Sequence, residues 1–195
     1  MLKSTVWISL FFSMALYAHP HIFATAFLSV AFEPSGELVI KNRWVFDELY
    51  SAAKVESIGA KKKGEVSKDE ALEIERSVVQ MAQRFNYYNY LLVGSQFLAA
   101  KNYKNLVVKR EGKNLAVYFD LIFDIKAKDD YTILTLAVRD LSTYIDIDLD
   151  INKVKVDAPP NIEVEYFTDV LKGLTLFKAF PPTMEGLYLR FRKKP

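Results

Sequence analysis

The hydrophobic and polar positions along the chain predict an α+β domain in which strands predominate. Apolar, aromatic and β-branched residues form a series of short runs separated by Gly, Pro and other turn-forming residues, a pattern typical of strands. The runs cover residues 21–32, 37–46, 90–93, 97–100, 106–110, 115–125, 131–138, 144–151, 162–167 and 187–192. We therefore expect a mostly antiparallel sheet or sandwich.

Two helices are predicted near the N-terminal third, between the second strand and the third. A short helix covers residues 47–55, where apolar residues recur at helical spacing. The longer helix begins after Ser67, which forms a capping box with Glu70 three residues later. Its apolar face continues to about Phe85, so one long and one short helix are inserted into the β domain.

The first 18 residues have the layout of a secretory signal peptide. Lys3 precedes an apolar run over residues 6–16, and Ala18 is a small residue suited to cleavage. The run is shorter than the roughly 20 apolar residues that a transmembrane helix needs, although an uncleaved membrane anchor is the alternative. We expect cleavage after Ala18 and a single domain over residues 19–195, exported to a bacterial periplasm.

Composition narrows the chemistry that the chain can perform. It contains no cysteine, which excludes disulfides, thiolate metal sites and cysteine nucleophiles. Its two histidines are too few for most catalytic triads and for multi-histidine metal sites. The formal net charge of +2 at pH 7 argues against a dedicated nucleic-acid binder. Because the common nucleotide-binding and hydrolase motifs are also absent from the sequence, we do not expect an enzyme.

Both histidines lie in the segment His19-Pro20-His21, at the predicted mature N-terminus. Cleavage would free an α-amine beside two imidazoles, and neutral nitrogen ligands suit Zn²⁺, Cu²⁺ and Ni²⁺. Pro20 has no N–H, so this terminus cannot form the square-planar chelate that uses a deprotonated second amide. A metal site would need His19, His21, the amine and a carboxylate from elsewhere. The alternative is a polar stub that leads into the first strand.

Asp47 and Glu48 are the candidate carboxylates for that site. They lie in the segment 44–51 (WVFDELYS), where Asp47 is placed to cap the short helix and Glu48 occupies its first turn. A strand-to-helix junction with Trp44 in the core would account for this segment without any metal. The functional interpretation makes Asp47 or Glu48 the missing ligand of the histidine site.

Two further patterns are interpreted as surface features. Residues 59–70 have the outline of an EF-hand calcium loop, but Lys61 and Lys63 stand where oxygen ligands are needed, so we expect no calcium from Gly59 to Glu70. Aspartates alternate with apolar residues over positions 146–150, which predicts the solvent face of a half-buried strand. A cation-attracting patch is the functional alternative for these aspartates.

The His-Pro-His start, together with the pattern W-x-F-D-E-x-Y-S from Trp44 to Ser51, resembles a bacterial periplasmic family. That family is defined only as a domain of unknown function, number one thousand and seven in its series. The resemblance covers the mature chain and includes the segment 140–144 (DLSTY), while lysines replace the acidic EF-hand-like loop of many members. Members are labelled as the periplasmic component of an uncharacterised ABC-type transport system and are often encoded beside nickel/cobalt-type permeases. The resemblance therefore implies transition-metal handling and carries no established activity.

We expect a non-catalytic periplasmic accessory protein of a transition-metal transport system, peripheral to the membrane at most. His19 and His21 would bind a divalent ion such as nickel, zinc or copper, with Asp47 or Glu48 in support. The protein would deliver the ion to a membrane permease, or sense it there. The alternative is a metal-free structural or interaction module that contacts such a permease.

Overall fold

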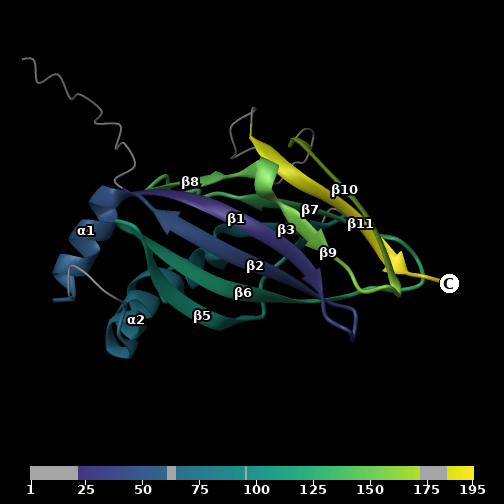
Figure 1. Ribbon diagram of the computed structural model, residues 1–195. Coiled ribbons are helices and arrows are strands. Elements are labelled where there is room, and N and C mark those ends of the chain that lie inside the picture. The colour runs from purple at the N-terminus through teal and green to yellow at the C-terminus, as the bar shows by residue number, and fades with distance from the viewer. Residues whose placement is uncertain (1–21, 61–64, 95, 172–183) are drawn as a thin grey trace, which may run out of the picture.

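A computed structural model describes residues 22–60, 65–94, 96–171 and 184–195, which fold as two β-sheets with short helical segments beside them (Figure 1). The predicted α+β class is confirmed, as is the predominance of antiparallel strands. The predicted signal peptide, His19 and His21 lie outside the described residues. Within the described part of the chain, no helix is both long enough and apolar enough to cross a membrane.

Sheet A has the strand order β5-β6-β2-β1-β8, with β9 also paired to β1. The β1–β2 hairpin was predicted almost to the residue, because two runs rich in aromatic and β-branched residues flank a Pro-Ser-Gly turn. The strands β8 and β9 run parallel to β1, and the other pairs are antiparallel. The bounds are β1 Ile22–Phe32, β2 Glu37–Phe46, β5 Asn102–Glu111, β6 Asn114–Lys126, β8 Ile145–Leu149 and β9 Lys155–Asp157.

Sheet B has the strand order β10-β11-β7-β3-β4, and all of its pairs are antiparallel. Its outer strands differ in length, since β4 has three residues and β10 has nine. The bounds are β3 Asn89–Val93, β4 Gln96–Leu98, β7 Thr132–Val138, β10 Ile162–Val170 and β11 Glu185–Lys193.

The helical segments fall where the sequence predicts them, but the longer one is not a regular α-helix. The capping box of Ser67 and Glu70 is present at the start of α2. The hydroxyl of Ser77 donates to the carbonyl oxygen of Glu73 at 2.7 Å, and such a bond competes with the backbone ladder where the helix widens into a π-helix. The bounds are α1 Glu48–Ser57, α2 Lys68–Ile74, the π-helix η1 Glu75–Gln80, and the 3₁₀ segments η2 Gln83–Tyr88 and η3 Ile151–Lys153.

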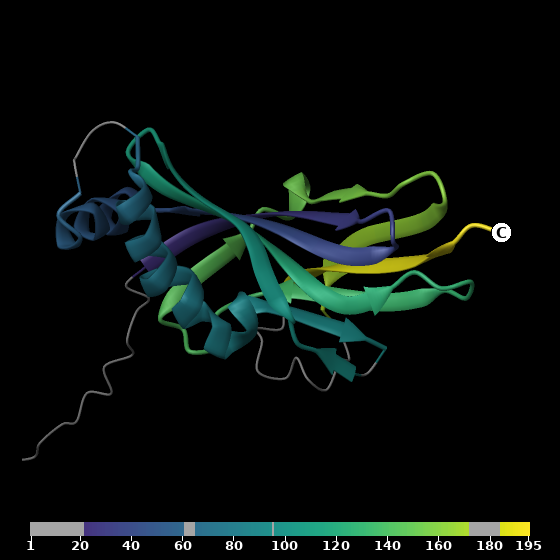
Figure 2. The ribbon, with the colours of Figure 1, turned by 90° about the horizontal axis from the view of Figure 1, so that it is seen from below.

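The core lies between the sheets and is rich in aromatic side chains. Trp44 is buried there with its ring edge-on to Phe119, the centroids 4.7 Å apart, so its predicted place in the core is confirmed. The helical residues 68–88 run alongside β5 (Figure 2), where Tyr103 donates a hydrogen bond to Glu75 at 2.7 Å. Their buried side chains Ile74, Val78, Val79 and Ala82 join the same core.

Candidate functional site

Asp47 joins the start of β1 to the start of α1. Its Oδ1 accepts a hydrogen bond from the backbone N–H of Tyr50 at 2.9 Å, which is the predicted helix cap. Its Oδ2 accepts from the backbone N–H of Phe23 at 3.0 Å, and its own N–H donates to the Phe23 carbonyl, also at 3.0 Å. The capping role is confirmed, and the same carboxylate holds β1 in place two residues after His21.

Strand β8 brings two further carboxylates to this point. Parallel pairing sets Asp146 beside Phe23 and Asp148 beside Thr25. These aspartates and Asp47 line a hollow of about 180 Å³, here called the acidic hollow. Its remaining lining residues are Phe23, Ala24, Thr25, Val45 and Asn114. Carboxylates from β8 and from the β2–α1 junction therefore share one small space beside the first strand.

The predicted solvent face of the aspartate strand is confirmed, because Ile147 is buried and Asp148 is exposed. The three aspartates nevertheless have different surroundings. Asp146 lies 3.7 Å from the guanidinium of Arg139, whereas Asp150 forms an ion pair with Lys153 at 2.9 Å. Asp148 therefore presents the carboxylate of the acidic hollow that is most accessible to solvent.

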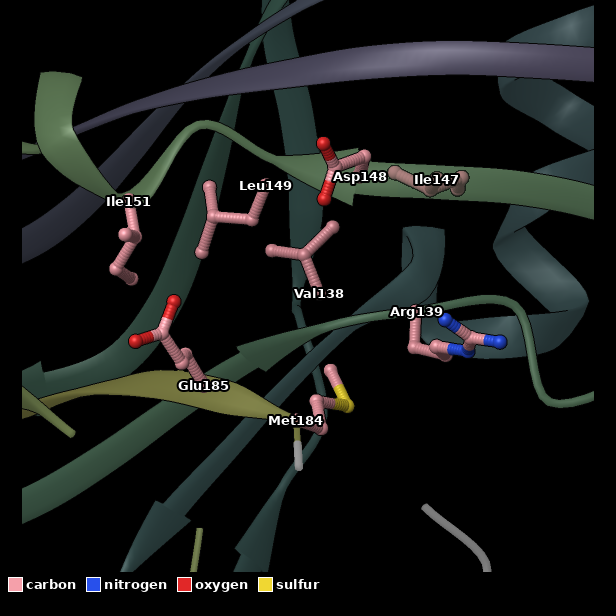
Figure 3. Close-up of a pocket in the computed structure, with 8 residues that line it drawn as sticks. All are labelled: Val138, Arg139, Ile147, Asp148, Leu149, Ile151, Met184 and Glu185. Atoms are coloured by element: carbon pink, nitrogen blue, oxygen red, sulfur yellow. The ribbon is translucent and has the colours of Figure 1, made fainter. Parts of the chain in front are cut away.

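A second cavity of about 240 Å³ lies on the other side of β8, between that strand, β7 and β11 (Figure 3). Asp148 belongs to the lining of both spaces. Figure 3 shows the guanidinium of Arg139 and the carboxylate of Glu185 on opposite sides of the cavity. Its other lining residues are Val138, Ile147, Leu149, Ile151 and Met184.

Glu48 is separated from Asp47, although the two are neighbours in sequence. Its carboxylate forms an exposed ion pair with Lys113 Nζ at 2.7 Å, and this hydrogen bond raises the pKa of Lys113. Glu48 lines a different hollow, along with Ser51 and Arg110. Of the two carboxylates proposed from the sequence, only Asp47 belongs to the acidic hollow.

A family model with the description "Protein of unknown function (DUF1007)" matches residues 4–173 of the chain. The chain belongs to the DUF1007 family. The predicted family resemblance is thereby confirmed, and the match includes the His-Pro-His, W-x-F-D-E-x-Y-S and DLSTY segments. A comparison with curated proteins yields no match for this DUF1007 protein.

The W-x-F-D-E-x-Y-S segment of the DUF1007 protein holds one end of the sandwich together. Tyr50 packs its ring against Phe46, with centroids 4.9 Å apart. Ser51 is buried, and its hydroxyl accepts a hydrogen bond from the N–H of Leu115 at 2.8 Å. Each of these contacts is structural, and they fix the strand-to-helix junction from which Asp47 reaches the acidic hollow.

The DLSTY segment forms a turn directly before β8. The carboxylate of Asp140 is buried and accepts hydrogen bonds from the N–H of Ser142 at 2.8 Å and the N–H of Ile145 at 2.9 Å. Nearby, burial raises the pKa of Tyr50 to about 12, with smaller contributions from Tyr144 and Asp47. Tyr50 therefore stays protonated well above neutral pH. The hydrogen bonds to Asp140 hold the turn that positions β8 beside β1.

Within the described residues, no three His, Asp or Glu side chains are grouped closely enough to hold a metal ion. Covalent geometry keeps the Cα atom of His21 within about 7 Å of the Cα atom of Phe23. The acidic hollow, which Phe23 lines together with the three aspartates, lies beside that point. The loop for which no calcium is predicted, Gly59–Glu70, falls partly outside the described residues.

Proposed function

We propose that this DUF1007 protein is a non-catalytic periplasmic accessory protein of a transition-metal transport system. It binds one divalent ion through His19 and His21, with carboxylate support from the acidic hollow. The observation that carries this proposal is that Asp47, Asp146 and Asp148 line one hollow at the start of β1. Three carboxylates from two separate segments lie beside the strand that begins one residue after the second histidine.

The proposed donor set combines two imidazoles and an α-amine with carboxylate oxygens. Zn²⁺, Ni²⁺ and Cu²⁺ all accept such mixed nitrogen and oxygen ligands. Asp47 retains acceptor capacity, because each oxygen of an ionised carboxylate has two lone pairs and each accepts one backbone N–H in this fold. Asp148 is exposed and can approach an ion without first breaking a buried contact.

The choice between the two carboxylates predicted from the sequence now favours Asp47. Glu48 has its carboxylate on Lys113 and lines another hollow. Asp146 and Asp148 replace it as the supporting acids.

A carboxylate about 6 Å from a divalent ion stabilises that ion by about 1.4 kcal/mol in water, which is about tenfold in affinity. Each acid of the hollow contributes through this attraction even where it is not a direct ligand.

A metal-free interaction module is the second candidate, and a different observation favours it. Phe23 is 51% exposed and Leu49 is 80% exposed, at the two segments that Asp47 joins. Exposed large apolar side chains can mark a contact with a partner protein. Under this alternative, the end of the sandwich contacts a membrane permease and binds no ion.

Titration calorimetry of residues 19–195 with Ni²⁺, Zn²⁺ and Cu²⁺ tests the proposal. The double variant His19→Ala/His21→Ala is expected to lose binding, and Asp148→Asn to weaken it about tenfold. Glu48→Gln is the matched control, since it removes a nearby carboxylate outside the acidic hollow and should leave the affinity unchanged. Circular dichroism confirms that each variant is folded. Equal affinity in the double-histidine variant and the parent would rule out the proposal.

A further inference from the structure

Strand β10 is a long sheet edge without the features that protect the other edges. An exposed strand edge presents unpaired N–H and C=O groups to other strands, and proteins usually guard it with bulges, lysine, proline or short length. In the described sheets, β4 and β9 have three residues each and β8 has five. The other long edge, β5, has a register shift between Lys104 and Val107 and a further lysine at 109.

The bulge, the lysine, the proline and the short length are all absent from β10, whose charged residues are Glu163, Glu165 and Asp169. Its register against β11 is unbroken from Ile162, opposite Lys193, to Val170, opposite Glu185. The strand contains neither lysine nor proline, and its sequence is IEVEYFTDV. Tyr166 is 48% exposed and Phe167 is 60% exposed. In the described part of the chain β10 pairs with β11 alone and lies along the outer edge of the molecule (Figure 1).

The hydrogen-bond pattern shows which residues of β10 face the open edge. The N–H of Leu171 donates to the carbonyl oxygen of Met184 at 2.8 Å, which makes this a hydrogen-bonded pair of the antiparallel ladder. Such pairs alternate with pairs that point their backbone groups outward. The backbone groups of Val164, Tyr166 and Thr168 therefore point away from β11.

We propose that β10 pairs antiparallel with β10 of a second copy of this chain, about a two-fold axis at Tyr166. The two five-stranded sheets B would then form one continuous sheet. Two-fold dimers with self-complementary interfaces are the commonest oligomers. The interface shares no residue with the acidic hollow, so this dimer is independent of metal binding.

The residues of β10 match their own copies in this register. Tyr166 lies opposite itself and Val164 opposite Thr168, and aromatic and β-branched residues are favoured as cross-strand neighbours. The same register sets Glu165 opposite Phe167. The side chains of Tyr166 and Phe167 are now partly exposed to water, and pairing with the second strand would bury more of their apolar surface.

One pairing sets like charges opposite each other, and the fold reduces its cost. Glu163 would face Asp169 of the second copy, and like charges directly across a sheet are destabilising. Arg192 donates a hydrogen bond to Glu163 at 2.8 Å and lowers the pKa of that carboxyl, so each Glu163 already carries its own counter-charge. Glu165 is neutralised in the same way by Arg190, also at 2.8 Å.

The absence of cysteine from the chain allows a direct test with two single-cysteine variants, Tyr166→Cys and Phe167→Cys. In the proposed dimer the two Cα atoms of residue 166 lie about 5.5 Å apart, within the range of a disulfide. The two Cα atoms of residue 167 are displaced along the strands and lie about 8 Å apart, beyond that range. Mild oxidation should therefore cross-link Tyr166→Cys at least tenfold faster than Phe167→Cys.

Sedimentation of residues 19–195 at 10 to 100 μM provides the second measurement. The parent chain is expected to be a dimer, and Thr168→Pro a folded monomer, since proline removes an outward N–H and spares the bonds to β11. Circular dichroism checks that the proline variant keeps its strands. A parent chain that is monomeric throughout this range, a Thr168→Pro dimer, or equal cross-linking of the two cysteine variants would each overturn the proposal.

Discussion

Replacing Asp47 by Ala tests whether one carboxylate holds both β1 and α1 at the end of the sandwich. The substitution removes the helix cap on the N–H of Tyr50 and the acceptor of the N–H of Phe23. Loss of an N-cap costs about 1 kcal/mol, and loss of a hydrogen bond to a charged acceptor in a solvent-accessible place costs about another 1 kcal/mol. The free energy of unfolding should therefore fall by about 2 kcal/mol.

For a domain of this length, a loss of about 2 kcal/mol lowers Tm by about 4 to 8 °C. The assay is thermal and urea unfolding in the presence of a chelator, so that metal binding does not contribute. Asp47→Asn keeps one side-chain oxygen and should lose about half as much. Glu48→Gln breaks only an exposed ion pair and should leave the stability almost unchanged. If Asp47→Ala is no less stable than Glu48→Gln, the structural role given to Asp47 is wrong.

Two other predictions concern the packing of sheet B and the ionisation of Tyr50. A Cβ atom at Gly186 would lie 2.5 Å from Leu171 Cδ2 and 2.9 Å from the Leu136 carbonyl oxygen, so Gly186→Ala should lower stability by about 1 to 3 kcal/mol; an unchanged Tm would contradict this. The pKa of Tyr50 in the fold is about 12, above its ordinary value of 10, so the folded chain keeps a proton that the unfolded chain releases. Stability should be unaffected by this group below pH 10 and should fall between pH 10 and 12 by about 1.4 kcal/mol per pH unit from Tyr50 alone. Urea unfolding at pH 9, 10 and 11 should show a shallower fall for Tyr50→Phe, and an identical slope would exclude Tyr50 as a source.

Local patterns in the sequence were enough to predict most elements of the fold. The hairpin of β1 and β2 follows from two runs rich in aromatic and β-branched residues around a Pro-Ser-Gly turn. The capping box of Ser67 predicts where α2 begins, because its two hydrogen bonds involve only neighbouring residues. Burial of Trp44 follows from its position in an apolar strand.

Pairings between distant segments were not predictable in this way. Alternation identifies the faces of a strand but not its neighbour, so the parallel pairing of β8 with β1 is absent from the local pattern. The approach of Asp146 and Asp148 to Asp47 depends on that pairing. The short strand β9 was not predicted either, because three residues are too few for a period-two pattern.

The long helix was predicted with the correct beginning but with the wrong internal geometry. Apolar spacing up to Phe85 is compatible with a regular helix, whereas the structure has a π-helix and then a 3₁₀ segment. Backbone bonding by Ser77 and the positive φ of Asn86, at 51°, mark these departures. Side-chain hydrogen bonds to the backbone are individually weak, so the apolar period did not reveal them.

Native mass spectrometry of the full chain, exported and processed by a bacterial host and then exposed to nickel, zinc and copper, tests the metal proposal most directly. The proposal predicts a mass that matches residues 19–195 with one bound metal ion, and the same result for Glu48→Gln. The variant His19→Ala/His21→Ala should retain none of the three metals. A mass that matches residues 19–195 with none of the three metals retained would contradict metal binding and leave the interaction module as the function of this end of the sandwich.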